Sequence, residues 1–357
     1  MFKKKTGIYT LALALAITGT TGCGSSGNSS ENAAKTTAAT EKTSDGTSAS
    51  TSENTSNNTS SESFSVVCTI FPEYDWVKEI LGDHADNVEL TCLLDNGVDL
   101  HSYQPTAEDM MKISTCDLFV YVGGESDEWV KDALADAQNK DMKVINLMES
   151  IGDAAKEEEL KEGMQGEEEE NEDDEEEDEI EYDEHVWLSV KNAKVFCTEI
   201  EKNIEAIDPA NAADYKANLD SYTAELSALD NSFQTLVDGS SVKVLVFGDR
   251  FPFRYFVDDY GLDYYAAFIG CSAETEASFE TIAFLADKVN ELDCKTIFTL
   301  ENSSKVIADT VISTSRKSVD IAELNSLQSI SKDEIAGGAS YISLMQKNYD
   351  VLANVLK

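Results

Sequence analysis

Short apolar segments alternate with helical patterns over most of the chain, and this alternation limits the fold more than any other feature. The first run has strand-like segments at residues 65–70, 88–94, 118–122 and 143–147, with helical patterns between them. The second run has strand-like segments at residues 242–247, 264–268 and 296–300, and helical patterns at 279–292, 305–315 and 337–357. Apolar strands that alternate with helices are typical of parallel sheets covered on both faces. The sequence therefore predicts an α/β protein of two lobes, each a mostly parallel sheet flanked by helices.

One long amphipathic helix is expected between the two runs, over residues 209–236. Large apolar residues recur there at alternating steps of four and three, which is the spacing of one stripe on an α-helix. They are Tyr215, Leu219, Tyr222, Leu226, Leu229, Phe233 and Leu236. The stripe fits either a coiled-coil dimer or a helix packed along two lobes of a monomer. Because both flanks are α/β, we favour the second, a rigid spine over 208–238 that limits hinge opening between the lobes.

The N-terminal segment has the pattern of a bacterial export signal. Residues 1–23 contain a lysine-rich start and a short apolar stretch, and they end in Thr-Thr-Gly-Cys. This ending resembles a lipobox, which predicts lipidation of Cys23; the alternative is an ordinary signal peptide with an incidental cysteine. Half of residues 24–63 are Ser or Thr, so we expect a flexible tether there. No other segment is apolar over a length that spans a bilayer. The N-terminal lobe is expected over 64–207 and the C-terminal lobe over 239–357.

The charge of the chain is strongly acidic and unevenly placed. There are 69 Asp and Glu against 27 Lys and Arg, a formal net charge of -42, which excludes nucleic-acid binding through a basic surface. Residues 157–184 hold 19 of the acids and one lysine, and we expect an extended, disordered loop there. Two roles stay open for it: a weak collector that raises the local concentration of a cation, or a solvating insertion without a role.

Histidines are the scarcest candidates for chemistry, since the chain has three. His101 and His185 lie in loops that lead into helices, and neither belongs to an apolar helical face, so both are candidate ligands. His84 follows a helix stop and fits an exposed cap. The seven cysteines form no Cys-x-x-Cys pattern, and most adjoin apolar residues, so buried thiols are expected. Export permits disulfides, but the sequence does not pair them.

Several motifs in order resemble the zinc- and manganese-binding lipoproteins of bacterial ABC importers, the cluster A-I solute-binding proteins. Residues 99–106 (DLHSYQPT) resemble that family's D-P-H-x-Y-E-P-T, and residues 184–189 (EHVWLS) resemble its P-H-x-W-L-S. Gly-Gly-Glu with a nearby Trp at 123–129, Phe-Arg-Tyr-Phe with Tyr-Gly-Leu at 253–262, and Phe-Thr-Leu-Glu at 298–301 are similar to three further motifs. The resemblance covers about residues 65–357.

The resemblance implies a divalent metal in the cleft between the lobes, held by about four nitrogen or oxygen ligands. It assigns His101 and His185 as the ligands from the first lobe. The family's third position, ten residues before the Tyr of Tyr-Gly-Leu, is occupied by Arg250, which cannot bind a cation. The last position is occupied by Asn325, whose amide oxygen is a weaker, neutral ligand.

Two ligand sets therefore stay open. Asp249 and Glu301 replace the lost ligands in the first; in the second, Arg250 pairs with Glu301, and His101, His185 and one acid hold the metal together with water. Imidazole suits zinc and oxygen ligands favour manganese, so Zn²⁺ is favoured and Mn²⁺ is the alternative. Because capture requires neutral histidines, we expect affinity to fall below about pH 6.

The resulting functional expectation is a solute-binding protein, lipid-anchored at the extracellular face of a bacterial membrane. It would deliver a divalent metal to an ABC permease and its ATPase. Alternatives are a surface adhesin of the same fold, or a binding protein whose Arg250 and Asn325 mark a non-metal ligand. An enzyme is not expected, because the sequence has no HExxH, nucleophile elbow or P-loop.

Overall fold

The computed structural model describes residues 63–166, 181–272 and 276–357. They all belong to one compact unit, Thr59–Lys357. The predicted export signal, and the predicted tether apart from Ser63, lie outside the described residues. Among the helices that are described, none is both long and apolar enough to cross a bilayer.

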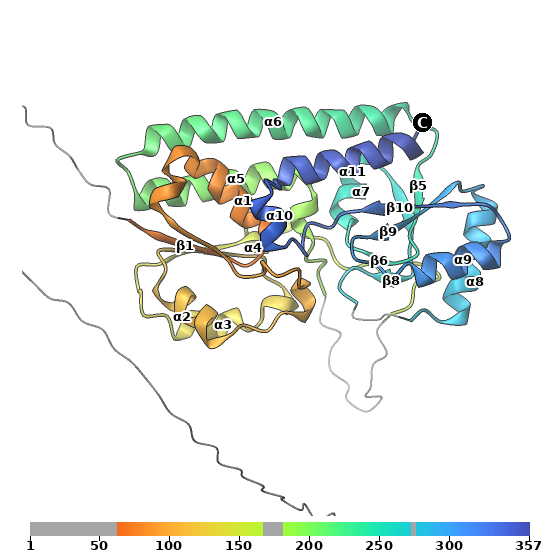
Figure 1. Cartoon of the computed structure of the whole chain (residues 1–357), viewed down its shortest axis with the longest axis horizontal. Helices are drawn as coiled ribbons and strands as arrows, with labels where there is room; N and C mark the ends of the chain where they lie inside the picture. The colour runs from red at the N-terminus through yellow and green to blue at the C-terminus, as the bar shows by residue number, and fades with distance from the viewer. Residues whose placement is uncertain (1–62, 167–180, 273–275) are drawn as a thin grey trace, which may run out of the picture. The chain divides into compact units, whose positions relative to one another are not determined.

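The first lobe is built on one parallel sheet with the strand order β2-β1-β3-β4 (Figure 1). Its strands are β1 (Ser65–Cys68), β2 (Glu89–Cys92), β3 (Leu118–Tyr121) and β4 (Lys143–Asn146). Its helices are α1 (Phe71–Leu81), α2 (Ala107–Thr115), α3 (Val130–Ala135), α4 (Leu147–Ile151) and α5 (Val190–Ile207). In Figure 1, α2 and α3 cover one face of the sheet and α1 and α5 the other, as expected for strands with no solvent-facing side.

The second lobe contains three parallel strand pairs, β5-β7, β6-β8 and β9-β10. The strands are β5 (Val244–Val246), β6 (Arg250–Phe251), β7 (Asp263–Tyr265), β8 (Phe268–Ile269), β9 (Thr296–Leu300) and β10 (Asp320–Leu324). The helices are α7 (Arg254–Tyr260), α8 (Phe279–Glu291), α9 (Val306–Ser315), α10 (Lys332–Ala336) and α11 (Tyr341–Val355). A parallel bridge between Phe247 and Phe298 joins the residue that follows β5 to the middle of β9. The predicted two-lobed α/β architecture is confirmed.

The long helix α6 (Ala212–Gly239) runs along both lobes, as the apolar stripe predicts (Figure 1). It contacts α1 and α5 of the first lobe and α7 and α11 of the second. The buried stripe ends on Val237, whereas the predicted Leu236 is only half-buried. The last side chain of the stripe is therefore shifted by one position.

The acidic segment is ordered at both ends, so the predicted disorder over 157–184 is too wide. Glu157 and Tyr182 form an antiparallel bridge. The residues that follow Glu157 then reach the second lobe, where Met164 is buried and the Gln165 N–H donates to the carbonyl of Ala267 at 2.9 Å. These apolar and backbone contacts explain why the ends of the segment are ordered. A count of charges does not reveal them. Residues 167–180 lie outside the described part of the chain.

Candidate metal centre

Each of the two candidate histidines lies in an Asp-x-His turn. The N–H of His101 donates to Asp99 Oδ1 at 3.0 Å, and the N–H of His185 donates to Asp183 Oδ1 at 2.8 Å. An Asp side chain that accepts from the backbone two residues on is a common turn-forming arrangement. The two turns therefore fix the backbone of both histidines independently of any bound ligand.

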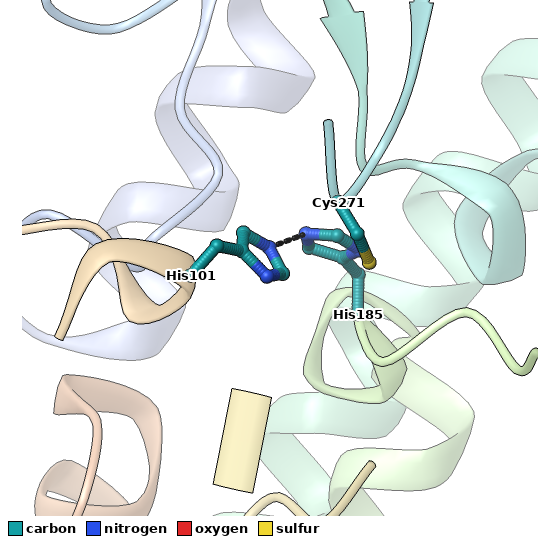
Figure 2. A group of neighbouring side chains, drawn as sticks. All are labelled: His101, His185 and Cys271. Carbon is teal, nitrogen blue, oxygen red and sulfur yellow. Dashed lines mark hydrogen bonds between the residues drawn. The ribbon is translucent and has the colours of Figure 1, made fainter. Parts of the chain in front are cut away.

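The two imidazoles point at each other through their Nε2 atoms, which are 3.1 Å apart (Figure 2). Each Nδ1 has its own partner: Ser126 Oγ lies 2.7 Å from that of His101, and Asp183 Oδ1 lies 3.1 Å from that of His185. The Asp183 carboxylate only accepts, so it holds a proton on Nδ1 of His185 and leaves the Nε2 lone pair of that ring for a metal. When Nδ1 of His101 donates to Ser126, its Nε2 lone pair is free as well. Two nitrogens of a tetrahedral zinc site are about 3.3 Å apart, so the pair has the spacing of two metal ligands.

The surroundings of the pair decide where a proton resides. Burial lowers the pKa of His101 to about 3, and the neighbouring His185 and Arg250 act in the same direction. Burial also lowers the pKa of His185, but the charge and hydrogen bond of Asp183, together with nearby glutamates, outweigh it and raise the pKa overall. A proton that enters the pair is therefore held by His185, and His101 stays neutral.

Cys271 is the third member of this group, and the sequence analysis did not identify it as a candidate. Among the described residues, one group of three or more His, Cys, Asp and Glu side chains has ligand atoms within 4.8 Å of one another: His101, His185 and Cys271 (Figure 2). The sequence predicts buried thiols for most of the cysteines and singles out none of them as a ligand. The available signal was its position just past the strand-like segment 264–268, because ligands gather at the carboxyl ends of parallel strands.

A cavity of about 270 Å³ adjoins the group and is acidic. His101 and Cys271 line it together with Glu158, Glu181 and Glu184. Glu184 is buried, and within the described structure its Oε2 has no hydrogen-bond partner; this atom lies 3.5 Å from His101 Nδ1. Burial raises the pKa of Glu158 to about 7, with Asp183 adding to the effect. Burial thus favours the uncharged form of this carboxyl, and what the cavity offers an entering cation is the unused oxygen atoms of Glu158 and Glu184.

Asp249 and Glu301 lie outside this group, with their carboxylates already engaged. Asp249 accepts from the N–H of Leu300 at 3.1 Å and of Arg250 at 2.9 Å. Glu301 accepts from the N–H of Ser326 at 2.7 Å and from its hydroxyl at 2.5 Å. Both carboxylates instead line a second cavity, of about 510 Å³.

Arg250 does pair with a carboxylate, but with that of Asp99 rather than that of Glu301. Its Nη2 lies 2.5 Å from Asp99 Oδ2, so the proposed pairing with Glu301 is wrong. The reason is that Ser326 already satisfies both oxygens of Glu301. Asn325 Oδ1 accepts from the N–H of Leu327 at 2.8 Å and lines a different cavity, so its amide maintains a turn.

Two lobes of parallel sheets, a connecting helix and a chelating pair beside an acidic cavity define a solute-binding protein for a small cation. A model of the family described as "Zinc-uptake complex component A periplasmic" (ZnuA) matches residues 66–355. The chain belongs to this family, which confirms the resemblance stated from its motifs. The family consists of solute-binding components of zinc uptake and not of enzymes.

Curated relatives carry zinc in their names. The chain is 33% identical over 295 residues to the high-affinity zinc uptake system protein ZnuA of Bacillus subtilis, covering 83% of this chain and 88% of that protein. It is 31% identical over 288 residues to the zinc-binding lipoprotein AdcA of Streptococcus pneumoniae, covering 81% of this chain and 55% of that protein. The chain thus spans about half the length of the AdcA relatives that it matches.

Solved structures show the same fold. The Zn(II)-bound ZnuA-like domain of Streptococcus pneumoniae AdcA superposes with a TM-score of 0.64 at 28% identity, over 82% of this chain and 99% of that one. The periplasmic zinc-binding protein TroA of Treponema pallidum superposes with a TM-score of 0.67 at 22% identity, over 82% of this chain and 99% of that one. The similarity to TroA concerns the fold alone.

Proposed function

We propose that this protein captures Zn²⁺ outside the cell and delivers it to the permease of an ABC importer driven by its ATPase. The observation that carries the proposal is the histidine pair, with Nε2 atoms 3.1 Å apart and a separate partner at each Nδ1. Two neutral imidazoles in this arrangement direct two lone pairs at one point. A cation at that point accepts both lone pairs and forms two coordinate bonds.

Zinc suits this centre better than manganese does. The converging atoms on His101 and His185 are nitrogens, which zinc accepts readily, whereas manganese favours carboxylate and water oxygen. Asp249 and Glu301 would reach an ion only after giving up their bonds to Leu300 and Ser326. We therefore assign the histidines as the core of the site and the two carboxylates as outer groups. The named relatives, zinc-uptake and zinc-binding proteins, support the same metal.

Delivery to a transporter requires that the protein stay near the membrane. We propose that Cys23 carries a lipid and that residues 24–63 tether the binding unit, as a monomer, to the extracellular face. The name of AdcA, a zinc-binding lipoprotein, supports this anchor. A Cys23→Ala variant would appear in the culture medium of the expressing bacterium, whereas the wild type would stay with the membrane fraction.

Metal content tests the capture step. Purified wild-type protein, reloaded with zinc and dialysed, should carry one zinc per chain by mass spectrometry. His101→Ala and His185→Ala should each lower zinc affinity roughly 100-fold or more, since losing a ligand costs at least as much as losing its hydrogen-bond partner. His84→Ala is the matched control, because His84 bonds Asp214 on the surface at 2.9 Å. A wild-type protein that binds neither zinc nor manganese rules the proposal out.

A further inference from the structure

We infer that Cys271 binds the captured metal as a thiolate, as the third protein ligand beside His101 and His185. The inference rests on the proposed function and specifies its ligand set. The three side chains come from three separate loops, and their ligand atoms lie within 4.8 Å of one another (Figure 2). Neither the motifs nor the names of the relatives point to a sulfur ligand.

Gly270 allows the loop of Cys271 to lie directly against His185. A Cβ at position 270 would sit 2.9 Å from Cε1 and 3.0 Å from Nδ1 of the His185 ring, and 2.9 Å from the carbonyl oxygen of Phe251. Carbon atoms do not approach so closely without strain, so only glycine permits this contact. The absence of a side chain at 270 therefore places the next residue, Cys271, beside the imidazole.

Arg250 fastens the same loop from its other side. Its Nη1 donates to the carbonyl oxygen of Ser272 at 3.3 Å, while its Nη2 bonds Asp99 Oδ2. Ser272 follows Cys271, and Asp99 forms the turn that holds His101. One guanidinium thus joins the loop that carries the thiol to the loop that carries an imidazole. Arg250 occupies the position where the family resemblance expects a metal ligand. It cannot bind metal itself, but it positions two groups that can.

The chemistry of the set is that of a zinc site. Zinc binds cysteine sulfur at about 2.3 Å and histidine nitrogen at about 2.0–2.1 Å, so sulfur and nitrogen in a closed tetrahedral site are about 3.6 Å apart. Closing from within 4.8 Å to about 3.6 Å requires a movement of about 1.2 Å at most. On binding, the S–H bond of Cys271 breaks, a sulfur–zinc bond forms, and the proton leaves to water. The adjoining 270 Å³ cavity has room for a water molecule as fourth ligand. Thiolate favours zinc over manganese.

Cobalt spectroscopy tests the sulfur bond directly, because Co²⁺ occupies zinc sites and shows a thiolate-to-metal charge-transfer band. Wild type and Cys294→Ser should show this band; Cys294 is the matched control, since it is a half-buried thiol of the same lobe. Cys271→Ser should lose the band, keep weak binding through the histidines, and bind zinc about 10- to 100-fold less tightly. Wild-type protein that binds Co²⁺ without the band overturns the inference and leaves zinc capture standing. Wild-type protein that binds neither Co²⁺ nor zinc refutes the proposed function itself.

Alkylation of the wild type provides a test without any variant. Among the described cysteines, Cys271 and Cys294 are half-buried and the other four are buried. Because burial and the neighbouring Glu158 and Asp183 raise the pKa of the Cys271 thiol well above its usual range, prolonged treatment with iodoacetamide at alkaline pH is needed. Followed by peptide mapping, it should label both half-buried thiols in the metal-free protein. With zinc bound, labelling of Cys271 should fall at least tenfold while that of Cys294 stays unchanged. Equal labelling of Cys271 with and without bound zinc would contradict the inference.

Discussion

Arg250 of the second lobe and Asp99 of the first lobe are joined by an ion pair of 2.5 Å next to the histidine pair. Gln328 adds a second contact to the same Asp99 oxygen at 2.8 Å. Asp99 also accepts from the N–H of His101, so one carboxylate holds a candidate ligand and connects the lobes. The carboxylate of Asp99 therefore has a structural role, because both of its oxygens accept hydrogen bonds.

Replacing Arg250 with Met should therefore destabilise the protein. The loss should be roughly 2 kcal/mol in urea unfolding, since a partly buried carboxylate loses its charged partner. Arg254→Met is the control: Arg254 pairs with the more exposed Asp258 and Glu159, and the loss should stay below about 1 kcal/mol. Equal losses in the two variants would show that the connection between the lobes adds nothing.

Zinc affinity should decrease as the pH is lowered, and of the two histidines only His185 should contribute to this decrease. Since the pKa of His185 is raised and that of His101 is lowered to about 3, a single histidine competes for protons between pH 8 and 4. Below the pKa of His185, zinc binding should displace one additional proton and not two. The plot of log affinity against pH should steepen accordingly. Asp183→Asn removes the carboxylate that raises this pKa and should move the onset to lower pH. Titration against a chromophoric chelator measures both slopes; an unchanged onset in Asp183→Asn contradicts the assignment.

Stability should rise as the pH falls below neutrality, partly through Asp75. Burial raises the pKa of this carboxyl from 3.8 to about 7, against the opposing hydrogen bond from the Tyr341 N–H. Because the pKa is higher in the folded protein, protonation of Asp75 stabilises the folded state. This stabilisation is complete below about pH 4 and is lost progressively as the pH rises towards 7. Asp75→Asn keeps an acceptor for Tyr341 and should stabilise the protein at pH 8 by on the order of 2 kcal/mol. Asp86→Asn, which removes the same charge at an exposed site, should leave the pH profile of Tm unchanged.

Gly270→Ala should weaken zinc binding with little effect on the rest of the fold. The added methyl group would overlap the His185 ring and the Phe251 carbonyl, and overpacking of this kind costs about 1–3 kcal/mol. Since the overlap falls on the ring of His185 and on the loop that carries Cys271, calorimetry should show lower zinc affinity. Gly239→Ala is the matched control, because no atom lies within 4 Å of a Cβ placed there. A loss of affinity in both variants would point to a general effect of the substitution.

The acidic segment should affect the rate of zinc capture and not its final affinity. We expect deletion of residues 167–180 to slow association at low salt, because fewer negative charges then attract the cation. Stopped-flow measurements at two salt concentrations test this hypothesis. A variant with these acids replaced by Gln and Asn keeps the length and should behave like the deletion. If both variants bind as fast as wild type at low salt, the segment has no collecting role.

The architecture followed from the sequence because its signals are local and periodic. The apolar stripe on α6 and the strand segments of the first lobe can be recognised in the sequence, because their buried residues recur with the period of a helix or a strand. The short strands β6 and β8 and the ordered ends of the acidic segment did not follow, since they depend on contacts between distant parts of the chain. The same distinction between local signals and contacts of distant segments applies to the residues of the candidate site.

The histidine pair could be identified from its motifs, but its surroundings could not. The Asp-x-His repeat at 99–101 and 183–185 was present in the sequence and would have indicated matching turns. Of the two alternatives that the sequence left open, the one in which Arg250 pairs with Glu301 was wrong, because spacing does not tell which carboxylate is already satisfied. Cys271 was missed because its approach to His185 depends on the absent side chain of Gly270.

The bridge between Glu157 and Tyr182 closes the acidic segment at its base. Because both ends are fixed there, the chain between Gly166 and Glu181 can change in length without displacing His185, and each doubling of such a loop costs only about 0.6 kcal/mol. This position is therefore suited to the insertion of a foreign sequence. A fluorescent reporter or an affinity peptide inserted there would be joined to the chain at Glu181, which lines the cavity beside His101, and could convert the protein into a zinc sensor.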